Sequence, residues 1–169
     1  MRERRDVLLA LGMLGGTAIL GASRAALAAE DCPRAAREAA IGSALLDRYV
    51  AAVNAHDPVA VADLGTEAYI QHSGRSPSGR QAQVENFRGI FARMPDVQVR
   101  VDDRIIAGDR IVARMSFSAT HTQPLQGIAP TGRRFTLQTI DIWRLEDGKF
   151  AEHWDLVDVA GLQKQLRGE

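Results

Sequence analysis

The sequence has only one cysteine, no excess of charge of either sign, and no apolar run long enough to cross a bilayer. Cys32 cannot form an internal disulfide, and no second cysteine provides the spacing of a metal site. The 21 basic and 21 acidic residues give a formal net charge of zero, so no global field favours nucleic acid or an anionic membrane. The 169 residues also contain no repeat, linker or low-complexity segment. These absences favour a single domain whose partner is a small molecule.

Residues 1–28 are typical of an export signal. A basic start is followed by a moderately apolar stretch, shorter than the ~20 residues that span a bilayer, and then by small residues. Arg4 and Arg5 stand before this stretch as in a twin-arginine signal, although the serine usual in front of them is missing. We expect a mature protein of residues 29–169 in the periplasm or outside the cell, with no stable membrane association after processing. An N-terminal membrane anchor is the alternative.

Three segments before residue 96 have the pattern of helices. The first runs from about 31 to 54, and the second begins at Asp57-Pro58, an N-cap residue followed by the proline favoured at the first helical position. The third runs from 78 to 94, where Pro95 ends it. The predicted apolar faces are Ile41, Leu45, Tyr49 and Val53 in the first helix, and Val84, Phe87, Phe91 and Met94 in the third. The segment YIQHS between the second and third helices is expected to be extended.

From residue 97 the apolar period changes to two, which is typical of strands. Four runs separated by turn sequences predict consecutive antiparallel strands over residues 97–106, 110–121, 133–145 and 149–157. A final amphipathic segment, residues 159–166, is expected to be helical. Helices followed by a meander predict an α+β domain in which N-terminal helices cover one face of a curved antiparallel sheet and enclose a pocket.

The last predicted hairpin contains EDGKFAEHWDLVD, which places ionisable side chains on one face of a strand. Two registers are possible. A two-residue turn pairs Leu145 with Phe150, whereas a three-residue loop with Gly148 in the left-handed region pairs Leu145 with Lys149. We favour the second because glycine has no Cβ to clash at that position. It puts Asp141 opposite His153, Thr139 opposite Asp155 and Trp143 opposite Ala151, and this polar face lines the predicted pocket.

The opposite face of the same hairpin is apolar. A monomer rarely leaves so apolar a sheet face in water, so we expect a homodimer that pairs through this outer sheet face. The residues concerned are Ile140, Ile142, Trp154 and Leu156.

Six short motifs occur in order between residues 40 and 166. They are Gln-His in YIQHS, Gly-Asp-Arg-Ile-Val, Thr-His, Pro-Thr-Gly-Arg, Asp-Gly-Lys and Glu-His-Trp-Asp. Together they resemble the SnoaL-like polyketide cyclase and ester cyclase group of the NTF2-like superfamily. The resemblance implies a cone-shaped α+β fold with a pocket inside the curved sheet, usually a dimer, and no metal or cofactor.

The resemblance also implies a catalytic residue. In the characterised cyclases of this group a late acidic residue is the general acid/base of an intramolecular aldol ring closure, and by position it matches Asp155. We expect Asp141 and His153 to act with it. The better-known cyclases carry histidine where this chain has Asp141, a departure that bears on the substrate. The expected substrate-binding residues are His72, His121, Thr139, Trp143, Met115 and Phe117.

These residues leave three functions open. The first is a cofactor-free acid/base enzyme of the cyclase, isomerase or lyase type that acts on a small apolar carbonyl compound. The second is a non-catalytic exported protein that binds a small ligand, and the third is an epoxide or ester hydrolase that uses the same carboxylates. Among the histidines and aspartates only His153 and Asp155 have the short spacing of a metal-ligand pair, so we expect no metal.

Overall fold

The computed structural model describes residues 18–169, and the side chains from residue 32 onward. The chain divides into two compact units, residues 1–34 and 35–169, and the second carries the fold described below. The predicted twin arginines lie outside the described residues, so the export signal and its cleavage stay predictions. Between residues 18 and 169 no helix combines the length and the apolar character needed to cross a membrane.

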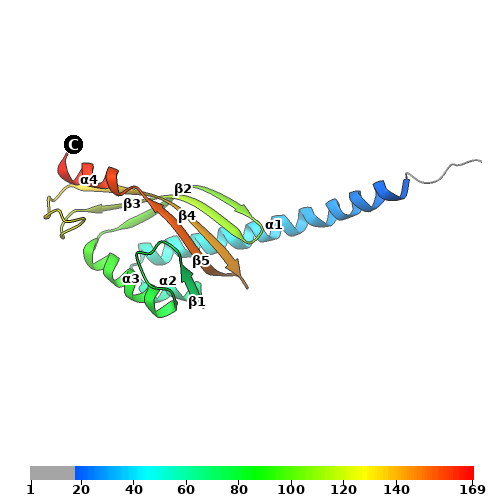
Figure 1. Ribbon diagram of the computed structural model, residues 1–169, viewed down its shortest axis with the longest axis horizontal. Helices are drawn as coiled ribbons and strands as arrows, with labels where there is room; N and C mark the ends of the chain where they lie inside the picture. The colour runs from blue at the N-terminus through cyan, green and yellow to red at the C-terminus, as the bar shows by residue number, and fades with distance from the viewer. Residues whose placement is uncertain (1–17) are drawn as a thin grey trace, which may run out of the picture. The chain divides into compact units, whose positions relative to one another are not determined.

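The described chain is an α+β structure, as predicted (Figure 1). Its elements are α1 (Ala18–Asn54), α2 (Pro58–Asp63), β1 (Gly65–Gln71), α3 (Arg80–Arg93), β2 (Gln98–Ala107), β3 (Arg110–Thr120), β4 (Arg134–Glu146), β5 (Lys149–Val157) and α4 (Val159–Arg167). The predicted cap of α2 is confirmed, because the Asp57 side chain accepts hydrogen bonds from the backbone N–H groups of Val59 and Ala60. The four predicted strands agree with β2–β5 to within one or two residues because period and turn chemistry are local signals.

Two details of the first helix differ from the prediction. Helix α1 begins at Ala18 and has Pro33 inside it, because the alanine-rich sequence around this proline strongly favours helix. Ile41 is 45% exposed although it was expected to be buried. Gly42 faces the sheet instead, since a Cβ at this position would lie 2.9 Å from the Ile106 side chain. The close contact of α1 with the sheet therefore uses the glycine, and the neighbouring isoleucine points elsewhere.

The five strands form one sheet in the order β1-β5-β4-β3-β2. Strands β2 to β5 are an antiparallel meander, but β1 pairs in parallel with β5. The four predicted antiparallel strands are confirmed, and the parallel strand β1 is an addition to the predicted sheet. No local turn sequence predicts this pairing, because Gln71 in β1 pairs with His153, which lies 82 positions later in the chain. The added strand brings the YIQHS segment to the edge of the pocket.

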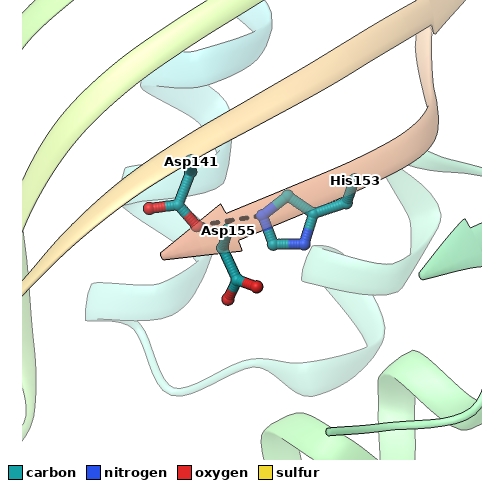
Figure 2. A group of neighbouring side chains, drawn as sticks. All are labelled: Asp141, His153 and Asp155. Carbon is teal, nitrogen blue, oxygen red and sulfur yellow. Dashed lines mark hydrogen bonds and ion pairs between the residues drawn. The ribbon is translucent and has the colours of Figure 1, made fainter. Parts of the chain in front are cut away.

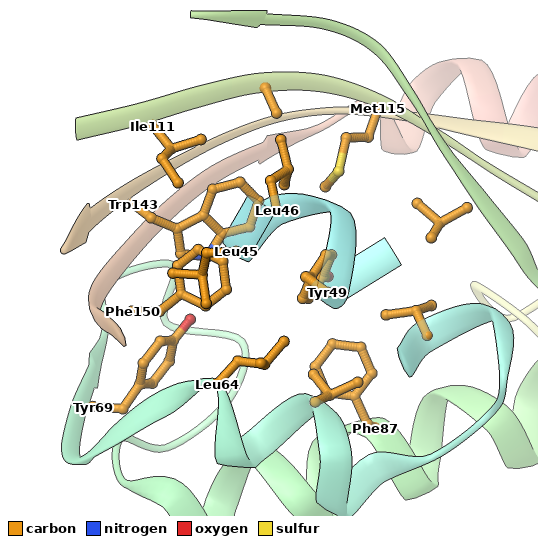
Figure 3. Packing of buried hydrophobic residues seen from close by; sticks show 14 residues of the cluster. Leu45, Leu46, Tyr49, Leu64, Tyr69, Phe87, Ile111, Met115, Trp143 and Phe150 are labelled. Atoms are coloured by element: carbon orange, nitrogen blue, oxygen red, sulfur yellow. The ribbon is translucent and has the colours of Figure 1, made fainter. Parts of the chain in front are cut away.

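The helices α1 to α3 pack over one face of this sheet (Figures 1 and 3). Leu45, Leu46 and Tyr49 of α1 belong to one buried cluster with sheet residues such as Met115 and Trp143. Burying one such side chain stabilises the fold by about 1.5–3 kcal/mol. Met115 is fully buried in this core and does not line the pocket, so its predicted substrate contact is wrong.

The register of the last hairpin also differs from the one we favoured. Asp147 and Gly148 both have positive φ, 50° and 72°, which forms a two-residue turn and pairs Leu145 with Phe150. An irregularity between Arg144 and Leu145 then adds one residue to β5. The pairs beyond it are Trp143 with His153, Asp141 with Asp155 and Thr139 with Val157. The polar side chains still face the pocket, but the two aspartates, rather than an aspartate and a histidine, are now directly opposite.

The outer face of the sheet carries an apolar patch on β4 and β5 beside charged side chains. Ile140, Ile142 and Leu156 are exposed, and the homodimer through this face stays a prediction. The His72 ring stacks on Trp154 with 4.3 Å between ring centroids. His72 therefore lies on the outer face and not in the pocket, where a substrate-binding residue was expected. Neighbouring residues of a strand point to opposite faces, and Gln71 takes the pocket side.

Glu152 on this outer face generates a prediction about acid stability. Its carboxylate accepts hydrogen bonds from Arg144 at 2.6 Å and from His72 at 2.8 Å. The Arg144 bond, and then the His72 bond, hold the pKa of Glu152 below its usual 4.5. A carboxylate with a lowered folded-state pKa stabilises the protein above its unfolded-state pKa, and this stabilisation is lost as the pH falls through the folded-state value.

We therefore expect Glu152→Gln to lower Tm at about pH 6 and to have progressively less effect towards about pH 3. Melting curves of the wild type and the variant across this range test it. The matched control is Glu146→Gln, because Glu146 also bonds Arg144 but is exposed. A constant difference in Tm between wild type and Glu152→Gln across the range would contradict the assignment.

Candidate functional site

A pocket of about 490 Å³ lies between the sheet and the helices of the second unit. Its walls are of two kinds. Apolar side chains from α3, β4 and α4, including Ile90, Leu137 and Leu162, form one part. Polar side chains from α1, β1, α3, β4, β5 and the loop after β1 form the other. The site residues described below all belong to this polar part.

Asp141 is buried, and both of its carboxylate oxygens are occupied. Oδ2 accepts a hydrogen bond from the Thr139 hydroxyl, and Oδ1 lies 2.9 Å from Nε2 of His153. The side chain of Asp141 is only 6% exposed. Since a buried carboxylate depends on such partners, these two bonds hold it in one orientation.

The hydrogen bonds around His153 determine which ring nitrogen carries the proton. The backbone N–H of Ser73 donates to Oε1 of Gln71 at 3.2 Å, so the other end of this amide, Nε2, must be the group 2.9 Å from Nδ1 of His153. An amide N–H can only donate, and Nδ1 is therefore the acceptor. The proton then sits on Nε2 and is donated to Asp141. Trp143 stacks on the same ring at 5.0 Å between centroids and 14° between planes.

Asp155 differs from Asp141, which it faces across the strands. Its Oδ2 forms an ion pair with Arg75 from the loop after β1, whereas Oδ1 is buried and has no hydrogen-bond partner among the described residues. Figure 2 shows the Asp155 carboxylate turned away from the bond that joins His153 and Asp141. Asp155 thus lines the pocket and carries a buried acceptor oxygen without a partner in the described part of the chain.

Two tyrosines, Tyr49 and Tyr69, also line the pocket. Burial, and then the charge of Asp141, raises the pKa of Tyr49 well above its usual value. Burial is also the main cause of the raised pKa of Tyr69, and it outweighs the lowering effect of a hydrogen bond with Trp143. Both hydroxyls therefore keep their protons at neutral pH and remain hydrogen-bond donors.

Asp141, His153 and Asp155 also offer one ligand atom each within 4.8 Å of one another, a spacing that a metal ion could use. Their present bonds do not suit a metal. A ligating histidine nitrogen must be free of its proton, but Nε2 of His153 donates one to Asp141. The positively charged guanidinium of Arg75 also lies against Asp155, where it would repel a metal cation. The expected absence of a metal or cofactor stays a prediction.

Five of the predicted site residues meet in the polar part of the pocket, and Phe117 lines its wall. These five are Thr139, Asp141, Trp143, His153 and Asp155. His121 does not line the pocket: it is 1% exposed, and its Nδ1 lies 2.9 Å from the Thr131 hydroxyl in the loop that follows β3. His121 was expected to bind the substrate, but it is buried against the loop between β3 and β4 instead.

Sequence reasoning missed several pocket residues. Gln71 had a usable signal, because it alternates with His72 in a strand-like segment and only one of the two can face the pocket. Arg75 had none, since it lies in an irregular loop whose position depends on the tertiary structure. Tyr49 was assigned to the apolar face of the first helix. That it also lines the pocket could not be predicted without the position of the cavity.

Comparison with known proteins gives one family match and similar relatives. A family model described as SnoaL-like polyketide cyclase matches residues 43–166. A nogalonic acid methyl ester cyclase of Streptomyces nogalater is 33% identical over 69 residues, which are 41% of this chain and 49% of that protein. The chain thus matches about half the length of this curated relative.

Two solved structures are similar over most of the chain. TsrD from Streptomyces laurentii has a TM-score of 0.70 and 35% identity, and the match covers 75% of this chain and 95% of TsrD. A protein with a ketosteroid isomerase-like fold from Catenulispora acidiphila has a TM-score of 0.61 and 17% identity, with coverage of 73% and 92%. The second likeness concerns the fold alone and agrees with the expected NTF2-like architecture.

The bonds of Gln71 predict the protonation of His153 in solution. In the wild type, ¹⁵N NMR of labelled histidine should show the proton of His153 on Nε2. Gln71→Glu replaces the donor at Nδ1 with an acceptor, so Nδ1 should gain a proton and its ¹⁵N signal should move accordingly. His121 provides an internal control, because its partner is Thr131 and its signals should not change. An unprotonated Nε2 in the wild type would contradict the hydrogen-bond assignment.

Proposed function

Because the chain belongs to the SnoaL-like polyketide cyclase family, we propose that it is a cofactor-free acid/base enzyme of the cyclase type with Asp155 as its general base. One observation carries the proposal: Oδ1 of Asp155 is a buried carboxylate oxygen without a partner, and Asp155 lines the pocket. A general base needs an open lone pair within reach of the substrate. Both oxygens of Asp141 already accept a hydrogen bond, one from Thr139 and one from His153, so Asp141 is the less available base of the two.

The reaction needs one proton acceptor and no added reagent. Asp155 Oδ1 takes a proton from the carbon next to a substrate carbonyl, and that carbon then forms a bond to a second carbonyl carbon of the same molecule. The oxygen of the second carbonyl takes the proton back from Asp155 and becomes a ring hydroxyl. Tyr49 and Tyr69 line the same pocket as hydrogen-bond donors, and donors of this kind stabilise oxygens on which negative charge grows.

Asp141 and His153 act as positioning residues in this proposal. Their hydrogen-bonding atoms bond one another and also Gln71 and Thr139. Each of these atoms thus already has a partner within the protein. What they supply is a fixed wall beside Asp155, with the His153 ring held against Trp143.

The pocket favours a mainly apolar substrate that carries oxygen at one part. Its volume of about 490 Å³ falls within the range of pockets that hold drug-sized ligands. The relative from Streptomyces nogalater is named as a cyclase of nogalonic acid methyl ester. We propose a carbonyl compound of this general kind as the substrate, and that compound is a suitable first probe.

Asp155→Asn tests the proposal. The amide keeps the shape of the side chain but cannot accept the substrate proton, so the turnover of nogalonic acid methyl ester should fall by about 10²- to 10⁴-fold. Binding of the compound should remain. Chromatography of the cyclised product gives the rate, and fluorescence quenching of Trp143, which lines the pocket, gives the binding.

The matched control is Asp63→Asn, because Asp63 also forms an ion pair with an arginine, Arg80, but its side chain is 55% exposed. Its turnover should equal that of the wild type. Binding without turnover in the wild type, for this and other enolisable ketones, would instead identify a ligand-binding protein. Equal rates for wild type and Asp155→Asn would remove Asp155 from the mechanism.

We also propose that the protein is exported through the twin-arginine route and acts in the periplasm or outside the cell. The support is the sequence of residues 1–28 alone. Replacing Arg4 and Arg5 together by lysine should leave the protein in the cytoplasm at its full length. Cell fractionation and mass measurement of the chain test this outcome. Unchanged export of the double variant would rule out this route.

A further inference from the structure

Among the described residues three buried side-chain atoms have no hydrogen-bond partner. They are Oδ1 of Asp155, Nε2 of Gln83 and Nε2 of His121. About nine in ten buried polar groups or more are paired in proteins, so each of these atoms requires an explanation. Asp155 and Gln83 line the same pocket, whereas His121 does not. Two of the three unpaired groups are thus gathered around one cavity.

Gln83 is held on the pocket side of α3. It is 7% exposed, and Phe87 and Ile90, four and seven positions later, line the pocket with it. This spacing belongs to one face of a helix. Gln81 on the same helix has a different environment, since it is exposed and donates a hydrogen bond to Glu85. The two glutamines therefore form a natural comparison.

The Nε2 atom of Gln83 makes no hydrogen bond that would stabilise the fold of the described residues. Burying an amide without a partner costs about 1–3 kcal/mol, and an apolar side chain of the same length avoids this cost. A ligand that brings an oxygen atom to Nε2 removes the penalty when it binds. Because the unpaired Nε2 is costly in the empty pocket, a ligand with a suitable acceptor should bind more tightly.

We infer that Gln83 is a substrate-binding residue that donates a hydrogen bond from Nε2 to a carbonyl oxygen of the ligand. The inference rests on the proposed function in one respect, because it takes the ligand to be the substrate of the enzyme. The open donor of Gln83 and the open acceptor of Asp155 together suit a ligand with a carbonyl oxygen and an acidic hydrogen. Enolisable carbonyl compounds carry both, and the apolar walls accommodate the rest of the molecule.

A pair of probes isolates the oxygen contact. Fluorene and 9-fluorenone share one flat tricyclic frame, and only the second has a carbonyl oxygen. The dissociation constants of both probes are measured with the wild-type protein and with Gln83→Met, by fluorescence quenching of Trp143 in the pocket wall. Methionine keeps the length of the side chain and removes the amide.

The wild type should bind 9-fluorenone more tightly than fluorene. In Gln83→Met the ratio of the two dissociation constants should fall by about three- to ten-fold, while the affinity for fluorene is unchanged or higher. Its Tm should not fall, because no protein partner of the amide is lost. Gln83→Glu should weaken 9-fluorenone further, since a carboxylate repels the carbonyl oxygen. Gln81→Met is the control and should keep the wild-type preference.

Three results would overturn the inference: an undiminished preference for 9-fluorenone in Gln83→Met, an equal loss of affinity for both probes, or no binding of either probe to the wild type. Failure of the proposed function is recognised separately. If no enolisable ketone is turned over but the preference depends on Gln83, the contact stands and the enzymatic proposal falls. Turnover that depends on Asp155, with no effect of Gln83→Met on either probe, is the reverse case.

Discussion

The placement of two aspartates directly opposite one another, in a pocket between a sheet and its helices, is the constraint on which the site depends. Side chains opposed in this way lie about 4.5–5.5 Å apart at Cβ, where like charges destabilise the pair. The protein gives the two groups different partners. Asp141 accepts hydrogen bonds from Thr139 and His153, whereas only one oxygen of Asp155, Oδ2, forms an ion pair with Arg75. This asymmetry leaves one carboxylate oxygen of Asp155 without a partner among the described residues and is the basis of the different roles proposed for the two aspartates.

The fold supports this arrangement at three levels. The extra residue in β5 sets the register that brings Asp141 and Asp155 face to face. The parallel strand β1 places Gln71 beside His153, and the backbone of Ser73 orients the Gln71 amide. The buried cluster that joins α1 to the sheet fixes the helix from which Tyr49 enters the pocket (Figure 3). Packing, strand pairing and hydrogen bonds therefore act on the same few side chains.

The sequence allowed the fold and most of the carboxylate cluster to be predicted, because the signals were local. Alternation along β4 and β5 put Thr139, Asp141, His153 and Asp155 on the pocket face, and a shift of register by an even number of residues does not change the face. The exact partners were wrong because a bulge inside a strand has no sequence signal as clear as that of a turn. The pairing of β1 with β5 and the position of Arg75 depend on contacts between segments about 80 residues apart. His72 was assigned to the pocket, but its ring belongs to the outer face with Trp154.

In the proposed reaction Asp155 removes a proton from a carbon atom of the substrate. The most direct measurement compares nogalonic acid methyl ester carrying hydrogen or deuterium at the carbon next to its carbonyl, under single-turnover conditions in which product release does not limit the rate. If Asp155 acts as proposed, the wild type converts the deuterated compound more slowly, because the bond to that atom breaks in the step assigned to Asp155. Equal single-turnover rates for the two compounds would contradict it.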